Sequence, residues 1–289
     1  MSIKQSELIL NPDGSIYHLN LRPEHIAENI IFVGDQDRVD KVTQHFDSIE
    51  FTTQKREFKT TTGIYKNKRV SVISTGIGPD NIDIVINELD ALVNIDLKTR
   101  AIKENHTQLN IVRIGTSGSL QKDIPIDSIL LSSHALDING MLRSYQVDEI
   151  SHSEIEDAFV KHTNWNPKKT YPLIVSNSKE LSEKIASEKT FTGITATAGG
   201  FYGPQGRVLR LALQDSELNN KIDSFNFNGN TITNLEMETS AIYGLAKLLG
   251  HNAVSMNAII ANRANGTFSE NPGKIVADLI KYTLDKLVE

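Results

Sequence analysis

The sequence predicts an α/β fold in which helices flank a largely parallel sheet. Apolar, β-rich runs recur and end in glycine, and the second of them leads into an amphipathic helix. The runs are "NIIFVGD" at 29–35, "RVSVISTGIG" at 69–78 and "NIVRIGTSG" at 110–118, and each is expected to be a strand that enters a tight turn. Ligands of such sheets gather at the carboxyl ends of strands, so we expect a site at these glycine-rich ends.

Helical periodicity marks two segments of the chain. After the second run, Pro79 suits a first helical turn, and apolar residues then fall on one face: Ile82, Val85, Ile86, Leu89, Leu92 and Val93. The closing segment, 271–289, repeats the pattern through Ile275, Val276, Leu279, Ile280 and Leu284. Because no repeat, low-complexity tract or long linker divides the sequence, we expect residues 1–289 to form a single domain.

The composition excludes several classes of protein. The chain has 289 residues, of which 39% are hydrophobic, and it contains no cysteine, so disulfides and thiolate chemistry are ruled out. A net charge of -6 argues against nucleic-acid binding, which needs a basic face. No apolar run approaches the ~18 residues of a membrane span, and the first residues lack the apolar core of a signal peptide. We therefore expect a cytoplasmic protein with a small-molecule partner.

Two arginines point to an anionic ligand. Arg113 lies inside the apolar run at 110–118, where an unpaired guanidinium would cost several kcal/mol, so it must meet an anion or a carboxylate. Arg38 follows Gly34 by four residues, at the expected start of a helix, where backbone N–H groups can bind anions. A guanidinium suits phosphate oxygens through its planar fork of donors. A phosphate-sized anion is the common partner that we expect.

Glu236 and Glu238, in "NLEMET", lie where a β-branched stretch gives way to a helical one. If the strand continues through both residues, their carboxylates share one face about 6.5–7 Å apart. Such a pair could act as acid and base in glycosidic hydrolysis, or could accept hydrogen bonds from ribose hydroxyls. The alternative is a solvent-facing acidic strand end before a helix N-terminus.

Seven short motifs make the sequence resemble a known family. They are "VGDQDR", "KREF", "STGIG", "RIGTSG", "FYGPQGR", "NLEMET" and "IIANR", in this order between about residues 17 and 263. Together they resemble the type I nucleoside phosphorylase family, most closely its uridine phosphorylases. The resemblance implies a three-layer α/β/α fold with a mixed, partly barrel-like central sheet. It also implies reversible attack of inorganic phosphate on a nucleoside, giving free base and ribose 1-phosphate in nucleoside salvage.

The resemblance assigns residues to the phosphate and ribose ends of a site. Matching motif positions imply phosphate contacts from Gly34, Arg38, Arg56, Arg113 and Thr116, and ribose contacts from His18, Glu236, Met237 and Glu238. Family members lend the residues that match Arg56 and His18 to a neighbouring subunit. We therefore expect a homo-oligomer with sites shared across a dimer interface, assembled in some members into a hexamer.

The base end matches the uridine phosphorylases of the family. Phe201 is expected to pack on the base, while Gln205 and Arg207 read the edge of uracil. Arg207 then joins Arg113 and Glu238 as a catalytic residue, because its charge stabilises the departing pyrimidine. The loop after Gln205 is shorter than in familiar members, so Arg210 is an alternative to Arg207.

The resemblance also bears on cofactors and on the alternative functions. The family uses no organic cofactor and no metal, although some members hold a monovalent cation between subunits near positions that match Glu57 and Ser74. Purine-specific members tend to carry an aspartate at the position of Asn262. A purine nucleoside phosphorylase and a nucleoside hydrolase of the same fold are the alternative functions.

Overall fold

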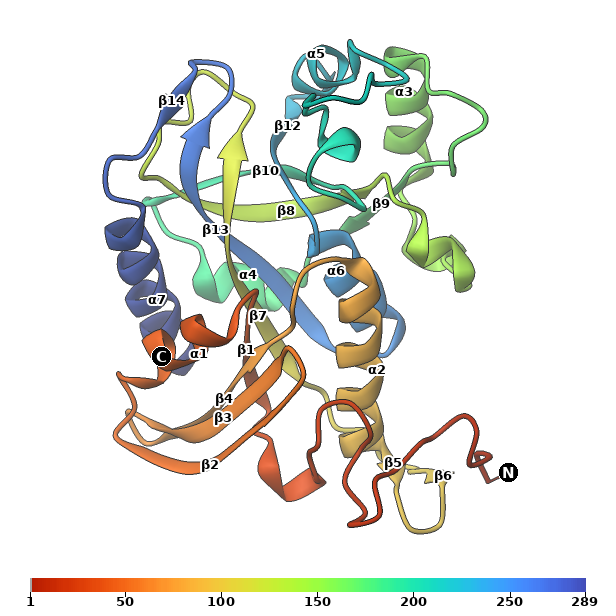
Figure 1. The fold of residues 1–289 in the computed structure, drawn as a ribbon, viewed down its shortest axis with the longest axis vertical. Coiled ribbons are helices and arrows are strands. Elements are labelled where there is room, and N and C mark those ends of the chain that lie inside the picture. The colour runs from red at the N-terminus through yellow and green to blue at the C-terminus, as the bar shows by residue number, and fades with distance from the viewer. Residues whose placement is uncertain (1) are drawn as a thin grey trace.

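The computed structural model describes residues 2–289, which form a large mixed sheet between two layers of helices (Figure 1). The strands are β1 (Asn29–Val33), β2 (Ser48–Lys55), β3 (Phe58–Tyr65), β4 (Lys68–Ser74), β5 (Ile95–Asp96), β6 (Ala101–Ile102), β7 (Asn110–Ser119), β8 (Ile129–Asp137), β9 (Leu173–Ser176), β10 (Thr190–Thr197), β11 (Asn226–Phe227), β12 (Asn230–Glu236), β13 (Asn252–Asn262) and β14 (Thr267–Phe268). The α-helices are α1 (Gln36–Thr43), α2 (Pro79–Asn94), α3 (Ser153–Thr163), α4 (Lys179–Ile185), α5 (Leu218–Asp223), α6 (Thr239–Leu248) and α7 (Pro272–Val288). Four short 3₁₀ helices in the described residues are η1 (Pro23–His25), η2 (Met141–Ser144), η3 (Asp148–Ile150) and η4 (Gly203–Gln205).

The central sheet is partly closed into a barrel. Its strand order is β11-β12-β10-β8-β13-β7-β1-β4-β3-β2, and β12 also pairs with β7. That second pairing is antiparallel and joins Asn234 to Ser119 and Leu235 to Gly118, so β12, β10, β8, β13 and β7 form a ring. The β1–β4 and β1–β7 pairs are parallel, whereas β2, β3 and β4 pair antiparallel. The mixed, partly barrel-like sheet expected from the resemblance is confirmed.

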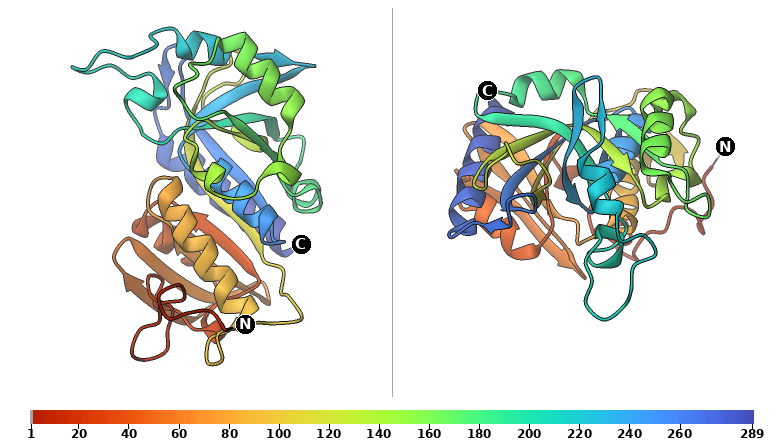
Figure 2. Two further views of the ribbon diagram at one scale, coloured as in Figure 1. Left: turned by 90° about the vertical axis from the view of Figure 1, so that its right-hand side faces the viewer. Right: turned by 90° about the horizontal axis from the view of Figure 1, so that it is seen from above.

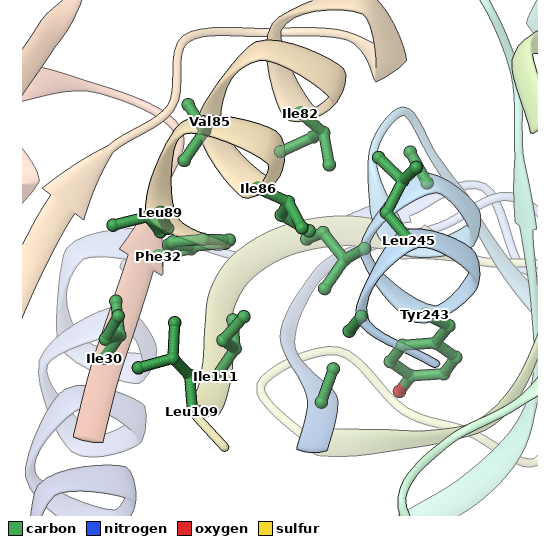
Figure 3. Packing of buried hydrophobic residues seen from close by; sticks show 14 of the residues in the cluster. Ile30, Phe32, Ile82, Val85, Ile86, Leu89, Leu109, Ile111, Tyr243 and Leu245 are labelled. Atoms are coloured by element: carbon green, nitrogen blue, oxygen red, sulfur yellow. The ribbon is translucent and has the colours of Figure 1, made fainter. Parts of the chain in front are cut away.

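Successive side chains of β1 pack alternately into two separate hydrophobic cores, because the strand is buried on both faces. Ile30 and Phe32 pack with α2 and α6 on one face, in the cluster drawn in Figure 3. Ile31 and Val33 pack with α1 and α7 on the other face. The predicted apolar stripes of α2 and α7 are buried except for Val93 and Val276, which are half-buried. The three-layer arrangement and both predicted helices are thus confirmed.

Two predicted strand boundaries differ from the structure. The run at 110–118 does not turn at its glycines, because β7 continues to Ser119 and pairs there with β12 and β13. The strand predicted to carry both glutamates ends instead at Glu236, and α6 begins at Thr239. The other two glycine-ended runs stop as predicted, β1 at Val33 and β4 at Ser74.

The topology gathers several strand ends on one side of the sheet. The strand β1 ends at Val33 beside Ile114 of the parallel strand β7, and the parallel strands β10 and β12 end at Thr197 and Glu236. The N-termini of α1, α2 and α6 directly follow β1, β4 and β12 in the chain. No helix within residues 2–289 is long and apolar enough to cross a bilayer.

Candidate active site

A buried guanidinium lies at the centre of the candidate site. Arg113 on β7 is only 8% exposed, and its Nη2 atom lies 2.5 Å from Oε2 of Glu238 and 3.4 Å from Oε2 of Glu236. Its Nη1 atom donates to Oδ1 of Asn257 at 3.1 Å. Burial alone would lower the pKa of Arg113, but the two carboxylates outweigh burial and raise that pKa. The prediction that Arg113 must meet an anionic group is confirmed, and the group within the chain is a carboxylate pair.

Gly115 allows the guanidinium to take this position. A Cβ atom on Gly115 would lie 1.8 Å from Nη1 of Arg113, so any side chain there would displace the guanidinium. Gly115 has no positive φ, and the strand runs straight through it. The glycine is therefore needed for a close approach of the arginine rather than for the turn that the sequence suggested.

Glu236 fixes the start of α6. Its Oε2 atom accepts hydrogen bonds from the backbone N–H groups of Glu238 and Thr239, each at 2.9 Å, and its Oε1 atom accepts one from the hydroxyl of Thr197 at 2.7 Å. These bonds satisfy backbone donors that a helix leaves free at its N-terminus. Since Glu236 is 4% exposed and Glu238 5% exposed, a solvent-facing acidic strand end is excluded.

Glu238, at the start of α6, contacts both the β4–α2 connection and β7. Its Oε1 atom accepts from the backbone N–H of Gly78 at 2.9 Å, while its Oε2 atom binds Arg113. Gly78 has a φ of 101°, which favours glycine, and it immediately precedes α2. Burial raises the pKa of the Glu238 carboxyl, Arg113 opposes that shift, and Glu236 adds to it. The carboxylate is held in one orientation and keeps lone pairs for further donors such as hydroxyl groups.

Arg38, in the first turn of α1, reaches the middle of β7. Its backbone N–H donates to the side chain of Asp35, which caps α1, and its Nη1 atom donates to the carbonyl of Ile114 at 3.3 Å. Burial lowers the pKa of Arg38; Asp35 opposes this, and the positive charge of Arg113 adds to it. Arg38 is already paired with Asp35 at 3.1 Å, as Arg113 is with the two glutamates, so the site offers two guanidiniums that are held in place by carboxylates.

Gly34 and Thr116 lie close to Arg38 in sequence or strand pairing. Gly34 adjoins open space, and the Thr116 hydroxyl is unbonded in the described part of the chain. A Cβ atom on Gly34 would meet no atom within 4 Å, so open space adjoins this residue. Thr116 is half-buried on β7, and its hydroxyl makes no hydrogen bond within residues 2–289. Together with Arg38 they offer donors and space of the kind that a tetrahedral oxyanion needs.

The residues predicted to read the base form a second polar cluster. Oε1 of Gln205 accepts hydrogen bonds from Nη1 of Arg207 at 2.6 Å and from Nη2 of Arg263 at 3.2 Å. The guanidinium of Arg207 also lies 3.8 Å from the ring centroid of Phe201. Burial lowers the pKa of Arg263 to about 10, with the charge of Arg207 adding to the shift, so both stay protonated at neutral pH.

The cluster decides which arginine pairs with Gln205. Arg207 binds the amide directly, whereas Arg210 is exposed and makes no hydrogen bond within residues 2–289. Which of the two arginines faces the base therefore stays a prediction. Phe201 is 51% exposed and its ring already stacks on Arg207, so its packing on a base stays a prediction.

Three other predicted residues, His18, Arg56 and Met237, make no polar side-chain contact with Arg113 or Glu238 among the residues that the structure describes. Nδ1 of His18 lies 2.7 Å from Oε1 of Glu88, and its backbone N–H donates to the same carboxylate. Arg56 is exposed at the β2–β3 turn, with a φ of 55°. Met237 is half-buried between the two glutamates. Within residues 2–289 neither His18 nor Arg56 bonds to Arg113 or Glu238, so their expected role in a neighbouring subunit stays a prediction.

Clusters of side chains that could bind a metal ion are absent from the described residues. Within residues 2–289, no group of three or more histidine and carboxylate side chains is arranged to hold a metal ion. At the position considered for a monovalent cation, the Ser74 hydroxyl donates to the carbonyl of Glu57 at 2.6 Å. Neither observation identifies a cation ligand set.

Three site residues were absent from the predicted set. Asn257 orients Arg113, Thr197 orients Glu236, and Arg263 shares the oxygen of Gln205. Asn257 carries the clearest sequence signal, since it is a lone amide in the apolar run "VSMNAII", much as Arg113 is a lone cation in its own. The partner of Thr197 depends on strand pairing, which the sequence does not reveal.

Comparison with known proteins shows the family to which the chain is similar. A family model described as the phosphorylase superfamily matches residues 28–288. The uridine phosphorylase of Thermococcus kodakarensis is 29% identical over 277 residues, 96% of this chain and 88% of that protein. A DeoD-type purine nucleoside phosphorylase of Bacillus cereus is 26% identical over 94% of this chain and 98% of its own. A solved nucleoside phosphorylase of Trypanosoma brucei, described as showing uridine phosphorylase activity, superposes with a TM-score of 0.88 at 28% identity, covering 98% of this chain and 99% of its own.

Proposed function

The chain belongs to the phosphorylase superfamily, and on this premise we propose that it catalyses the reversible phosphorolysis of uridine. Inorganic phosphate attacks C1′ of the ribose, the bond from C1′ to N1 of uracil breaks, and its electron pair leaves with the base. The products are uracil and ribose 1-phosphate. We expect this pentosyl transfer to serve nucleoside salvage in the cytoplasm.

The buried contact between Arg113 and Glu238 is the observation that carries the proposal. It places a fixed cation and a fixed carboxylate 2.5 Å apart at the strand ends, next to Arg38. The two guanidiniums and Thr116 bind phosphate below the sugar, while Glu238 accepts hydrogen bonds from the ribose hydroxyls and Met237 packs under the ring. Phosphate is already a nucleophile, so the site needs no general base to create one. Its task is to hold an oxocarbenium-like sugar between an anion and a departing base.

Glu236 serves the ribose end through its neighbours. Its hydrogen bonds to the N–H groups of Glu238 and Thr239 hold the start of α6, from which Glu238 reaches the sugar. We therefore assign Glu236 as a positioning residue beside the ribose. A glutamate pair of this kind differs from an acid and base pair, since one member is already bonded to backbone.

The base end supports uridine over purine nucleosides. Gln205 and Arg207 bind the edge of uracil, and the guanidinium stabilises the negative charge that the ring acquires as the bond breaks. A purine would need a proton donor at N7, and Asn262 is not free for that task. Its Nδ2 atom donates to the carbonyls of Gln121 and Ile124, both at 2.8 Å, and the residue is 1% exposed.

Phosphate-dependent cleavage tests the proposal. Purified protein is mixed with uridine, cytidine or inosine, with and without phosphate, and both free base and ribose 1-phosphate are measured. We expect uracil and ribose 1-phosphate in equal amounts from uridine only when phosphate is present. Release of uracil without phosphate would identify a hydrolase instead, and a preference for inosine would identify a purine nucleoside phosphorylase.

We propose further that each site is completed by Arg56 and His18 of a neighbouring copy. Arg56 is exposed at a turn and unpaired through its side chain within residues 2–289, which supports a role outside its own site. Mixing inactive Arg56→Ala with inactive Glu238→Ala under conditions of subunit exchange should restore part of the activity, because some sites then lack both lesions. No recovery despite proven exchange would contradict a shared site.

A further inference from the structure

A large cavity lies beside the loop that carries Gln205 and Arg207, and Arg207 of the candidate active site is among the residues that line it. Its volume is about 860 Å³, and Arg113, Glu238, Gln205 and Arg263 do not line it. One wall comes from the segment 207–215 and the other from the α3–β9 connection around Trp165 and Thr170. Figure 2 shows the first of these segments, in cyan, projecting from the body of the molecule.

Apolar side chains form much of this cavity although they remain accessible to water. Leu209 is 79% exposed and Leu211 is 83% exposed, and both line it. The Trp165 indole lies at the opposite wall, where it is 8% exposed and its N–H donates to the carbonyl of Thr170 at 3.0 Å. Such surface is the usual lining of a small-molecule pocket, because burying it against a ligand is favourable.

The charged residues of the cavity are unbalanced. Lys168, Lys169, Arg207 and Arg210 line it, against a single carboxylate, Asp215. That carboxylate is already paired with Lys221 at 2.8 Å. Lys169 lies over the Trp165 ring, with its Nζ atom 4.8 Å from the centroid. The cavity therefore combines an aromatic and aliphatic wall with excess positive charge.

We propose that this cavity binds a small aromatic anion, in which a flat apolar body lies against Trp165 and the leucines and an acidic group meets the cationic residues. The charge complementarity favours an anion over a neutral ligand of the same shape. This cavity adjoins the proposed nucleoside site, and the two share Arg207, whose Nη1 atom also donates to Gln205. Nε and Nη2 of Arg207 make no hydrogen bond within residues 2–289 and can turn to the anion.

Sharing Arg207 makes the cavity a regulatory site, a consequence that rests on the proposed function. An anion beside Arg207 reduces the positive charge available to the departing uracil, so turnover falls while phosphate binding is unchanged. Binding itself does not depend on the proposed reaction. The two statements can therefore fail separately.

Trp165 offers a local readout, since it is the only tryptophan of the chain. The probe is 1-anilinonaphthalene-8-sulfonate, which has an aromatic body and one sulfonate and accepts excitation energy from tryptophan. Its neutral counterpart, N-phenyl-1-naphthylamine, lacks the sulfonate. We expect saturable energy transfer from Trp165 to the sulfonate, and binding of the neutral compound weaker by about three- to tenfold. Equal binding of both compounds would overturn the anion assignment, and no saturable transfer would overturn the site.

Substitutions of the cationic residues test where in the cavity the sulfonate of the probe binds. Lys168→Ala and Arg210→Ala should each weaken energy transfer about three- to tenfold, whereas Lys189→Ala, an exposed lysine that does not line the cavity, should leave it unchanged. Equal effects of all three would overturn the proposal. A saturating mixture of uracil and phosphate should not displace the probe, and competitive displacement would show that the probe occupies the nucleoside site.

Discussion

The two halves of the candidate site are built in different ways. The Arg113 half is buried, and its charged groups are bonded to strands and helix starts: Arg113 to Asn257, Glu236 to Thr197, and Glu238 to Gly78. The Gln205 half lies on the connection between β10 and α5, where Gln205 is buried but Phe201 is 51% exposed. Within the proposed function, the first half performs the sugar chemistry common to nucleosides, and the second selects the base.

This difference follows from the energetics of each environment. Buried charges must be paired in precise geometry, so a rigid sheet with a closed ring of strands suits them. A loop carries fewer packing constraints and can change its side chains at little cost in stability. Substitutions in the two halves should therefore differ both in what they change and in how strongly they act.

Removing Arg113 should have the largest effect. Arg113→Ala leaves Glu236 and Glu238 buried beside one another without a cation, and it removes the partner of a desolvated phosphate, with an expected loss of ~3–5 kcal/mol. The apparent KM for phosphate should rise strongly, kcat should fall, and the melting temperature should drop. Steady-state kinetics with varied phosphate and a thermal melt provide the measurement. An unchanged phosphate dependence would refute the assignment.

A matched pair of leucine truncations compares the scaffold with the loop. Leu89 on α2 is 0% exposed and Leu209 is 79% exposed. Leu89→Ala should lower the free energy of unfolding by about 2–5 kcal/mol, while Leu209→Ala should change it by less than about 0.5 kcal/mol. Urea denaturation of the two variants measures this difference. Similar losses for both would mean that the loop is part of the cooperative core.

Thr197 tests whether the support of Glu236 matters for the site. Its hydroxyl donates to Glu236 and accepts from the backbone N–H of Ser240 at 2.9 Å. Thr197→Val should cost roughly 1–3 kcal/mol in stability, and kcat should fall because the start of α6 is loosened. Thr231→Val, on the same sheet but without a side-chain hydrogen bond within residues 2–289, is the control. Equal kinetics in both variants would rule out a positioning role.

Acid should lower the stability of the sheet through His134, by less than the substitutions above. Burial lowers the pKa of His134 on β8, and the charges of His152 and Lys247 add to that shift. A lowered folded-state pKa gives stability that is present above the unfolded value of 6.5 and is lost as pH falls through the folded value. Melting temperatures should therefore decrease below about pH 6.5, and less steeply in His134→Gln. Identical pH dependence in both proteins would contradict this origin.

Much of the catalytic half could be predicted because its signals are local. Arg113 within an apolar strand and the change from strand to helix around Glu236 and Glu238 are visible in the sequence alone. The role of Gly115 was misjudged, since a glycine needed for the close approach of a guanidinium looks the same as one needed for a turn. Thr197 was missed, and Arg263 of the motif "IIANR" was given no site role, because their partners come from distant segments that only the fold brings together.

The division of labour between the two halves is tested most directly by the kinetics of Arg207→Ala. With uridine and phosphate varied in turn, kcat for uridine should fall by about 10- to 1000-fold, as expected when one charge that stabilises the transition state is removed. The apparent KM for phosphate should stay within about twofold of the original value, because Arg113 and Arg38 are untouched. If Arg207→Ala leaves kcat unchanged while Arg210→Ala lowers it, Arg210 takes the role given to Arg207 on the same loop. If Arg207→Ala instead raises the phosphate KM as strongly as it lowers kcat, the division between a phosphate and sugar half and a base half is contradicted.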